Sequence, residues 1–140
     1  VCELSASPKL VTGWVVEVDN KVVGHIAFTK CAVGSDEAVF LLGPLAVSPK
    51  LQRKGLGKKL IELGLSDLAA RNASMVFVLG DPAYYSRSGF LAERVVMPPF
   101  VLPAEWDGAW QSLKIDQSVE PVSAKLVVPP VWDKKALWSG

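Results

Sequence analysis

A glycine-rich, basic segment near the middle of the chain has the clearest potential for chemistry, and it reads QRKGLGKK over residues 52–59. Its two glycines, Gly55 and Gly57, allow a tight turn and a close approach of the backbone to a ligand. Free N–H groups at the start of a following helix, together with the positive end of its dipole, bind anions. Basic side chains around the glycines add positive charge. We therefore favour a phosphate-binding turn over a plain helix entry with solvated lysines.

The spacing of this turn excludes two common phosphate-binding motifs. A P-loop needs Gly, four residues and then Gly-Lys-Ser/Thr, but here Gly57-Lys58 is followed by Lys59 and position 52 is Gln. A dinucleotide fingerprint needs a third glycine at the position that Leu60 occupies. The turn is a phosphate-binding candidate of another kind.

The segments on either side of the turn predict the elements that position it. Val39 to Val47 is nearly all apolar and predicts a strand buried on both faces. Gly43-Pro44 inside it predicts a bulge or a point where two strands part, because Pro cannot donate to a ladder. An apolar stripe at helical spacing predicts a helix from Leu56 to about Arg71. Met75 to Leu79 then predicts a short strand parallel to the first.

Two further units flank this βαβ core. Gly13 to Asp19 and Val22 to Cys31 predict a hairpin, with turn chemistry between them. Asp81 as N-cap and Pro82 as the first helical residue predict a short helix, which Gly89 closes as a C-cap.

The C-terminal third gives weaker patterns. Leu91 to Met97 and Trp110 to Ile115 predict an antiparallel pair, and Ala124 to Val128 predicts a last strand. Four tryptophans in this third are expected to pack in the core and in a lid: Trp106, Trp110, Trp132 and Trp138. Residues 1–140 are thus expected to form a single α/β domain with a mixed, mostly antiparallel sheet.

Composition excludes several function classes. A net charge of +1 gives neither the electrostatic footprint of a nucleic-acid-binding protein nor a polybasic membrane signal. The longest apolar stretch, residues 38–47, is too short to span a bilayer. Two cysteines and one histidine are too few for a disulfide framework or a zinc site, and no signal peptide precedes the domain. We expect a cytoplasmic protein without a metal.

In order and spacing, three sequence blocks resemble the GNAT superfamily of N-acetyltransferases, within it the YhbS-like bacterial branch. Gly43 to Val47 reads GPLAV, Gln52 to Gly57 fits the family's Q/R-x-x-G-x-G/A signature, and Leu79 to Phe90 reads LGDPAYYSRSGF. The resemblance is close from Gly13 to Phe90 and looser beyond. It implies a GNAT fold, with a twisted, mostly antiparallel sheet, a splayed parallel central strand pair and flanking helices. It also implies acetyl-CoA as cofactor.

The resemblance further implies a set of site residues. The pantetheine arm of coenzyme A bonds to the backbone of the fourth family strand, and the N–H of Leu45 polarises the thioester carbonyl. Tyr85 matches the tyrosine that can protonate the leaving thiolate. Tyr84 is outside that register, so Tyr84→Phe is expected to do little. Leu45 and Tyr85 are the implied catalytic residues, and the implied cofactor contacts are Leu45, Ala46, Val47, Gln52, Arg53, Lys54, Gly55, Leu56, Gly57, Lys58, Lys59 and Tyr85.

The general base stays unassigned. Relatives with a glutamate base on the fourth strand place it where this chain has Leu41. Asp81 ranks first among the alternatives Asp36, Glu37 and Asp81, although a helix cap is the simpler account of it. His25 is expected to be structural or to line the pocket. Cys31 stays open as a covalent nucleophile.

The activity implied is direct acetyl transfer from acetyl-CoA to a primary amine, on a small molecule or a peptide, in a ternary complex. The alternatives are a module that binds acetyl-CoA without turnover, and a subunit that a partner completes. Only about a dozen residues precede Gly13, so the family's N-terminal strand and helices are expected to be missing. Uncovered apolar sheet surface would then favour association with a second copy or another protein. The acceptor stays open among amino sugars, polyamines, antibiotics, amino acids and protein N-termini.

Overall fold

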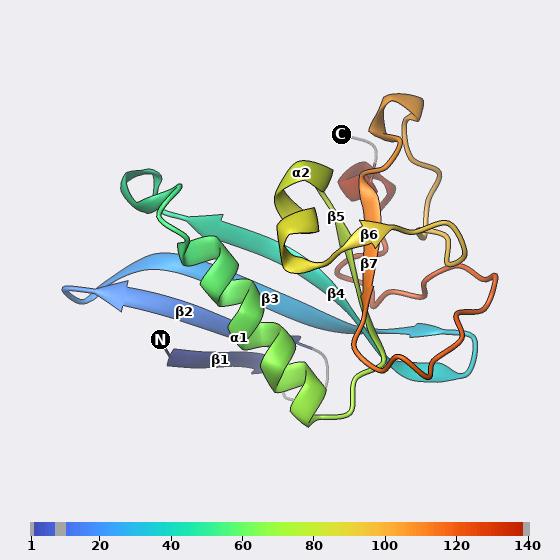
Figure 1. The fold of residues 1–140 in the computed structure, drawn as a ribbon, viewed down its shortest axis with the longest axis horizontal. Helices are drawn as coiled ribbons and strands as arrows, with labels where there is room; N and C mark the ends of the chain where they lie inside the picture. Colours follow the sequence, from blue (N-terminus) through green and yellow to red (C-terminus); the bar gives the residue numbers. More distant parts are fainter. Residues whose placement is uncertain (1, 8–10, 139–140) are drawn as a thin grey trace.

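A seven-stranded sheet forms the centre of the computed structural model, which describes residues 2–7 and 11–138 (Figure 1). Its spatial order is β1-β2-β3-β4-β5-β7-β6. Neighbouring strands are antiparallel except β4 and β5, which are parallel. The strands are β1 (Cys2–Ser7), β2 (Val11–Val18), β3 (Lys21–Val33), β4 (Asp36–Val47), β5 (Met75–Leu79), β6 (Leu91–Ala92) and β7 (Trp110–Lys114). The mixed sheet with one parallel central pair confirms the predicted fold class.

The β2–β3 hairpin forms where the sequence predicts it. Asp19 and Asn20 alone connect the strands, and both have positive φ (51° and 64°). A two-residue turn with positive φ at both positions matches the right-handed twist of the flanking strands. Asn and Asp tolerate this conformation better than most residues. β1 lies antiparallel to β2, and the sequence does not predict this strand.

β4 and β5 pair over only a short stretch and then part. Their pairing is limited to Val39–Leu41 against Met75–Phe77. On its other edge, β4 shifts register against β3 at Gly43-Pro44, so β4 carries a bulge there. Both structural predictions for this dipeptide are therefore confirmed.

The prediction that this strand is buried on both faces is wrong for its second half. Leu41 and Leu42 are 2% and 4% exposed, whereas Pro44 and Ala46 are exposed. The difference arises because only one face of this half is covered: Leu45 and Val47 pack partly buried against the core on the α1 side, and the two exposed residues alternate with them on the other face.

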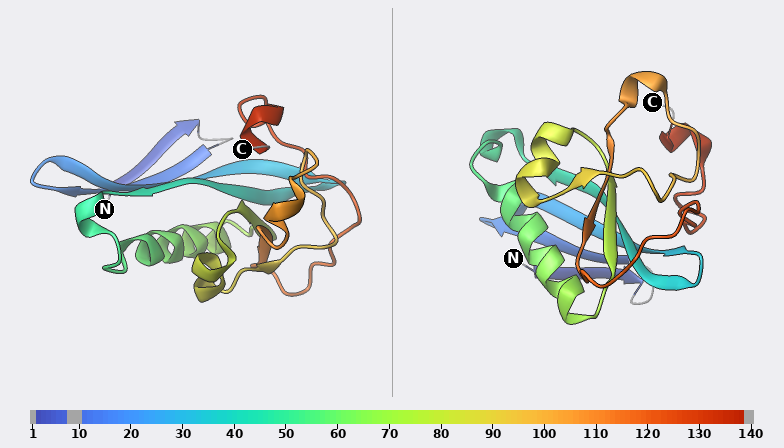
Figure 2. Two further views of the ribbon diagram at one scale, coloured as in Figure 1. Left: turned by 90° about the horizontal axis from the view of Figure 1, so that it is seen from above. Right: turned by 45° about the vertical axis from the view of Figure 1, so that its right-hand side comes forward.

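Helix α1 (Leu56–Ala70) packs across one face of β2, β3 and β4 (Figure 2). Its buried stripe includes Leu60, Ile61 and Leu68 and confirms the predicted helix. The other helical elements are α2 (Pro82–Tyr85) and the 3₁₀ helices η1 (Pro49–Leu51), η2 (Ser86–Ser88), η3 (Ala104–Trp106) and η4 (Lys135–Trp138). Asp81 caps α2 and Gly89 (φ 98°) ends η2, as predicted. No helix among the described residues is long and apolar enough to cross a membrane.

The C-terminal segment covers the opposite face of the sheet, where η4 lies in Figure 2. Trp110 stacks on Phe77 with ring centroids 5.5 Å apart, and Trp138 meets Trp110 edge-on at 5.7 Å. Trp110 and Trp138 are buried, and Trp132 packs partly buried against the same cluster. These three tryptophans therefore pack as core and cover, as predicted, whereas Trp106 is half-buried in η3 and belongs to neither core cluster.

Two predictions for the C-terminal third are only partly right. β6 ends at Ala92 rather than Met97, because the Glu93 carboxylate accepts the N–H groups of Val95 and Val96 and turns the backbone. Residues 124–128 form no strand of their own. They make isolated bridges, one to Met97 and one to Ala32, because the segment crosses between two elements instead of following one.

Candidate functional site

The loop between β4 and α1 is held in an unusual conformation. The side-chain amide of Gln52 donates to the carbonyl of Val47 (3.1 Å) and ties the loop to the end of β4. Arg53 and Gly55 both have positive φ, 66° and 81°. For a non-glycine residue such as Arg53, that conformation costs about 1–2 kcal/mol. Strain of this kind is typical of functional sites.

The N-terminus of α1 is open. No side chain caps it, and the first intrahelical bond runs from the N–H of Lys59 to the carbonyl of Gly55 (3.1 Å). The N–H groups of Leu56, Gly57 and Lys58 therefore have no acceptor within the helix. A Cβ built on Gly55 would meet no atom within 4 Å, so the space beside the residue that precedes these donors is open.

The charge around this open end is positive. Four exposed basic side chains surround it: Arg53, Lys54, Lys58 and Lys59. The ion pairs of the described residues, Arg71–Asp67 and Arg94–Asp107, involve none of these four. Donors, dipole and charge together make this loop and helix end suited to an anion.

Tyr84 lies against this helix end, which the sequence interpretation missed. Its hydroxyl occupies the place that a Cβ on Gly57 would take. Burial raises the pKa of Tyr84, and Arg87 opposes that rise. A signal existed in the sequence: adjacent residues on a helix point in different directions, so Tyr84 and Tyr85 could not share one environment. Gly57 therefore needs to lack a side chain in order to pack against Tyr84, in addition to any close approach of a ligand.

The hydrogen bonds between β3 and β4 determine which backbone groups of β4 point toward the gap where β4 and β5 separate. Ser48 donates its N–H to the carbonyl of Val23 (2.7 Å). Hydrogen-bonded pairs alternate along an antiparallel ladder, so the next such pair is His25 with Ala46. The backbone of Ala46 is therefore used by β3, and only its side chain is free for a ligand.

The backbone groups of Leu45 and Val47 point the other way, toward the gap left by β5. The bond from Gln52 to the carbonyl of Val47 agrees with this orientation. Since β5 stops pairing with β4 at Leu41, the N–H and carbonyl of Leu45 are left to bind a ligand. An extended chain could add here as a further strand.

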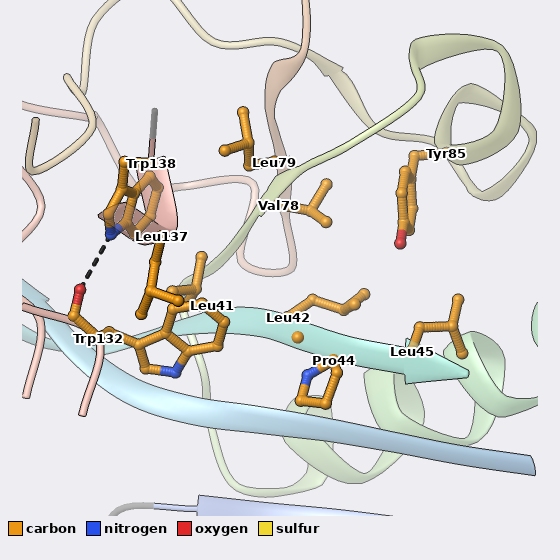
Figure 3. Close-up of a pocket in the computed structure, with 11 residues that line it drawn as sticks. Leu41, Leu42, Pro44, Leu45, Val78, Leu79, Tyr85, Trp132, Leu137 and Trp138 are labelled. Carbon is orange, nitrogen blue, oxygen red and sulfur yellow. Dashed lines mark hydrogen bonds between the residues drawn. The ribbon is translucent and has the colours of Figure 1, made fainter. Parts of the chain in front are cut away.

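Tyr85 points its hydroxyl into the gap between β4 and β5 (Figure 3). Its ring packs edge-on against Phe90 at 5.8 Å, and the Asp81 cap, whose carboxylate accepts the N–H of Ala83 (2.9 Å), fixes the start of its helix. Burial raises the pKa of Tyr85 to about 12, and neighbouring Tyr84 adds to this rise. The phenol therefore keeps its proton throughout the neutral and mildly basic range.

A pocket of about 320 Å³ lies where the two strands part (Figure 3). Its walls come from β4, β5, α2 and the C-terminal segment, and consist of Leu41, Leu42, Gly43, Pro44, Leu45, Val78, Leu79, Tyr85, Trp132, Leu137 and Trp138. Leu42, Val78 and Tyr85 belong to the α1 side of the sheet, whereas Leu41 and Trp138 belong to the other side. The pocket thus passes through the sheet from one face to the other.

The candidate bases do not meet in this pocket. Asp36 and Glu37 begin β4, roughly 30 Å along the strand from Leu45 at ~3.3 Å per residue. Asp81 is engaged as the cap of α2. His25 is half-buried on β3 and is not a lining residue.

Cys31 is no available nucleophile in this structure. It is 5% exposed, and burial raises the pKa of its thiol to about 12. The part of the chain that the structure describes also holds no cluster of three His, Cys, Asp or Glu side chains that could bind a metal ion.

Comparison with known proteins agrees with this geometry. The profile of the acetyltransferase (GNAT) family matches residues 3–90. The uncharacterized N-acetyltransferase YjhQ of Escherichia coli is 34% identical over 112 residues, which cover 76% of this chain and 61% of YjhQ. The uncharacterized N-acetyltransferase YhbS of the same organism is 37% identical over 73 residues, covering 51% of this chain and 44% of YhbS. The chain therefore spans less than two thirds of the length of these curated relatives.

Solved structures show the same fold. The crystal structure of Escherichia coli YhbS in complex with CoA superposes with a TM-score of 0.78 at 28% identity, covering 89% of this chain and 71% of that chain. A GNAT family acetyltransferase of Brucella melitensis in complex with acetyl-CoA gives 0.66 at 31%, covering 87% and 68%. The splayed parallel pair and the glycine-rich helix entry define an acetyltransferase fold. This chain belongs to the acetyltransferase (GNAT) family.

Proposed function

We propose that the protein is an acetyl-CoA-dependent N-acetyltransferase that acetylates a primary amine by direct attack in a ternary complex. One observation carries the proposal: the free backbone of Leu45 on a splayed strand leads directly to the open N-terminus of α1. An extended arm and a pyrophosphate need these two features in this order. The CoA complex of YhbS and the acetyl-CoA complex of the Brucella protein support it.

The cofactor fits the described residues at both features. The free N–H groups of residues 56–58, the open space at Gly55 and the basic side chains around them suit the pyrophosphate. Leu45 and the N–H of Val47 suit the amides of the pantetheine arm. Acetyl-CoA supplies the acetyl thioester when bound.

Three of the predicted contact residues have narrower roles in this proposal. Gln52 holds the loop to Val47, and the side chain of Leu56 packs against Gly24, so both contribute to the cofactor site by position and main chain. Ala46 contributes only its exposed side chain, because its backbone belongs to the β3 ladder.

In this proposal the N–H of Leu45 stabilises charge on the thioester oxygen, and Tyr85 donates a hydrogen bond to the departing sulfur. A phenol with a pKa of about 12 holds its proton far more tightly than a thiol of pKa about 8.5. Tyr85 therefore assists as a hydrogen-bond donor rather than by complete proton transfer. The buried thiol of Cys31 supports direct attack over a covalent enzyme intermediate.

A second candidate is a module that binds acetyl-CoA without turnover. The favouring observation is that no Asp, Glu or His lines the pocket among the described residues. A partner that supplies the missing base would make the chain a subunit of an active assembly.

Calorimetric titration with acetyl-CoA tests the cofactor assignment. Gly55→Val should weaken binding by about 100-fold or more, because a side chain would enter the open space before the helix donors. Gly34→Val is the matched control, since Gly34 also has positive φ (57°) but lies in the β3–β4 turn. Equal affinity of the Gly55→Val and Gly34→Val proteins would reject the assignment. Thiol release with a panel of amines then separates enzyme from binding module.

A further inference from the structure

The side chains that line the pocket at the strand parting offer almost no polar group to its occupant, so its polar contacts come from the backbone, such as the N–H and carbonyl of Leu45. All of its lining side chains are apolar except the phenol of Tyr85 and two indoles. The indole N–H of Trp132 already donates to the hydroxyl of Thr29 (3.1 Å), and that of Trp138 donates to the carbonyl of Trp132 (2.9 Å). Both tryptophans therefore present only ring surface to the pocket.

The walls also carry no charge. No Asp, Glu, His, Lys or Arg is among the lining residues that the structure describes. An ammonium group buried here would lose its water without gaining a carboxylate, which strongly disfavours the charged form. The same environment favours an uncharged amine with an apolar body.

The two ends of the pocket would meet different substrates, the acetyl group at one end and the acceptor at the other. Tyr85 and Leu45 lie toward the α1 side, where the proposed acetyl group arrives, whereas Trp132, Leu137 and Trp138 enclose the opposite end (Figure 3). A volume of about 320 Å³ is at the small end of the range for ligand sites. It suits one aromatic ring or branched alkyl group.

Resting on the proposed function, we propose that the acceptor is a primary amine with a single compact apolar substituent, bound as the free base. The amine loses its proton to solvent before binding, so no enzyme base is required. Its nitrogen lone pair forms the C–N bond to the acetyl carbon, the C–S bond breaks with its electron pair on sulfur, and one amine proton ends on that sulfur as the thiol. Polyamines and aminoglycosides are excluded as good acceptors because they would bring uncompensated charge.

Initial rates with 2-phenylethylamine and spermidine test this proposal. We expect kcat/KM to favour 2-phenylethylamine by about 100-fold or more, the order of effect of an unpaired buried charge. For this amine, kcat/KM should rise about tenfold per pH unit toward the pKa of an alkylamine, about 10.4 for lysine. Comparable rates for spermidine, or a rate independent of pH, would overturn the proposal.

Tryptophan fluorescence gives a readout that needs no turnover, since two tryptophans wall the pocket. 2-Phenylethylamine should change the emission saturably, and more so at pH 9 than at pH 7. Leu137→Asp places a carboxylate on an exposed lining residue (48% exposed), which should weaken 2-phenylethylamine and improve spermidine. Val131→Asp, in the same segment but outside the lining, is the matched control (60% exposed) and should change neither.

The outcomes separate this proposal from the cofactor assignment. Acetyl-CoA binding without any fluorescence response to 2-phenylethylamine overturns the acceptor class and leaves the cofactor assignment intact. A fluorescence response that is lost in Leu137→Asp, in a protein that binds no acetyl-CoA, supports the apolar amine site and rejects the acetyltransferase. Equal effects of Leu137→Asp and Val131→Asp would also overturn the proposal.

Discussion

Replacing Gly57 by alanine tests the contact between Tyr84 and the start of α1. In the wild-type protein the added Cβ would meet the Tyr84 hydroxyl, so one of the two must move. Overpacking costs about 1–3 kcal/mol in a tightly packed core, and the cost here is at the low end because the hydroxyl ends a side chain that is 37% exposed and can shift. Alanine gains at most about 1 kcal/mol over glycine in a helix, so we expect Gly57→Ala to lower the free energy of unfolding by no more than about 1 kcal/mol.

Tyr84→Phe should relieve this clash. With the hydroxyl gone, the nearest ring carbon lies 3.4 Å from the added Cβ, which is an ordinary contact. The double variant should then be at least as stable as Tyr84→Phe alone, a coupling energy of about 1 kcal/mol. The expectation that Tyr84→Phe by itself does little stays a prediction, because it concerns the protein with glycine at position 57.

Urea unfolding of the four proteins measures the coupling by linear extrapolation. Gly64→Ala is the control, because its Cβ would meet the ring of Phe28 in the core, far from Tyr84 in the chain. Tyr84→Phe should not rescue it. Absence of rescue at Gly57 would refute the placement of Tyr84. The acetyl-CoA affinity of the double variant then shows whether Gly57 also contacts the cofactor. If it does, the double variant should bind acetyl-CoA weakly although its stability is restored.

Three further predictions concern single residues. Tyr85→Phe should lower turnover by about 10- to 100-fold at unchanged acetyl-CoA affinity, and because the pKa of Tyr85 is about 12, wild-type rates should show no basic limb from this group below pH 10. Arg53→Gly should raise stability by about 1 kcal/mol by relieving its positive φ, yet weaken acetyl-CoA binding several-fold, as calorimetry and thermal unfolding can show. Cys31 should resist iodoacetamide at pH 8 in a Cys2→Ser background. The pKa of the Cys31 thiol is about 12 in the folded protein and 9.0 in the unfolded chain, so its contribution to stability is present below pH 9 and is lost as pH rises. The free energy of unfolding should therefore be about 1 kcal/mol lower at pH 10 than at pH 9. This difference should be smaller in Cys31→Ala.

The central part of the fold was predictable because each element carries a local signal. The apolar stripe gives α1, Asp19-Asn20 gives the hairpin turn, and Gly43-Pro44 marks both the bulge and the parting of β4 from β5. These features depend on side-chain periodicity and backbone chemistry within a few residues.

The parts that failed depend on contacts between distant segments. Residues 124–128 look like a strand by composition, but their partners are Ala32 and Met97, which only the folded chain brings together. The pocket walls Trp132 and Trp138 lie some 90 residues from β4 in sequence, so no local pattern places them there. The same two residues cover apolar sheet surface on the side away from α1, and association with a second copy or another protein stays a prediction.

The positions of the expected site residues in the fold were predictable where the expected contacts run through the main chain. The resemblance placed Leu45 and the loop of residues 52–59 correctly at the strand parting and at the helix start. The resemblance could not tell the free backbone of Leu45 from the paired backbone of Ala46. Which of the two is paired depends on the hydrogen-bond pattern between β3 and β4, which the bond from Ser48 to Val23 shows. Their roles toward acetyl-CoA stay proposals.

Amide chemical shifts of the protein titrated with CoA test the central claim most directly. We expect the largest changes on Leu45, Val47, Leu56, Gly57 and Lys58, whose N–H groups face the proposed arm and pyrophosphate. Amides at the far end of β4, Asp36 and Glu37, should stay unchanged. Saturable changes centred on the far end of β4, or no changes at millimolar CoA, would contradict it.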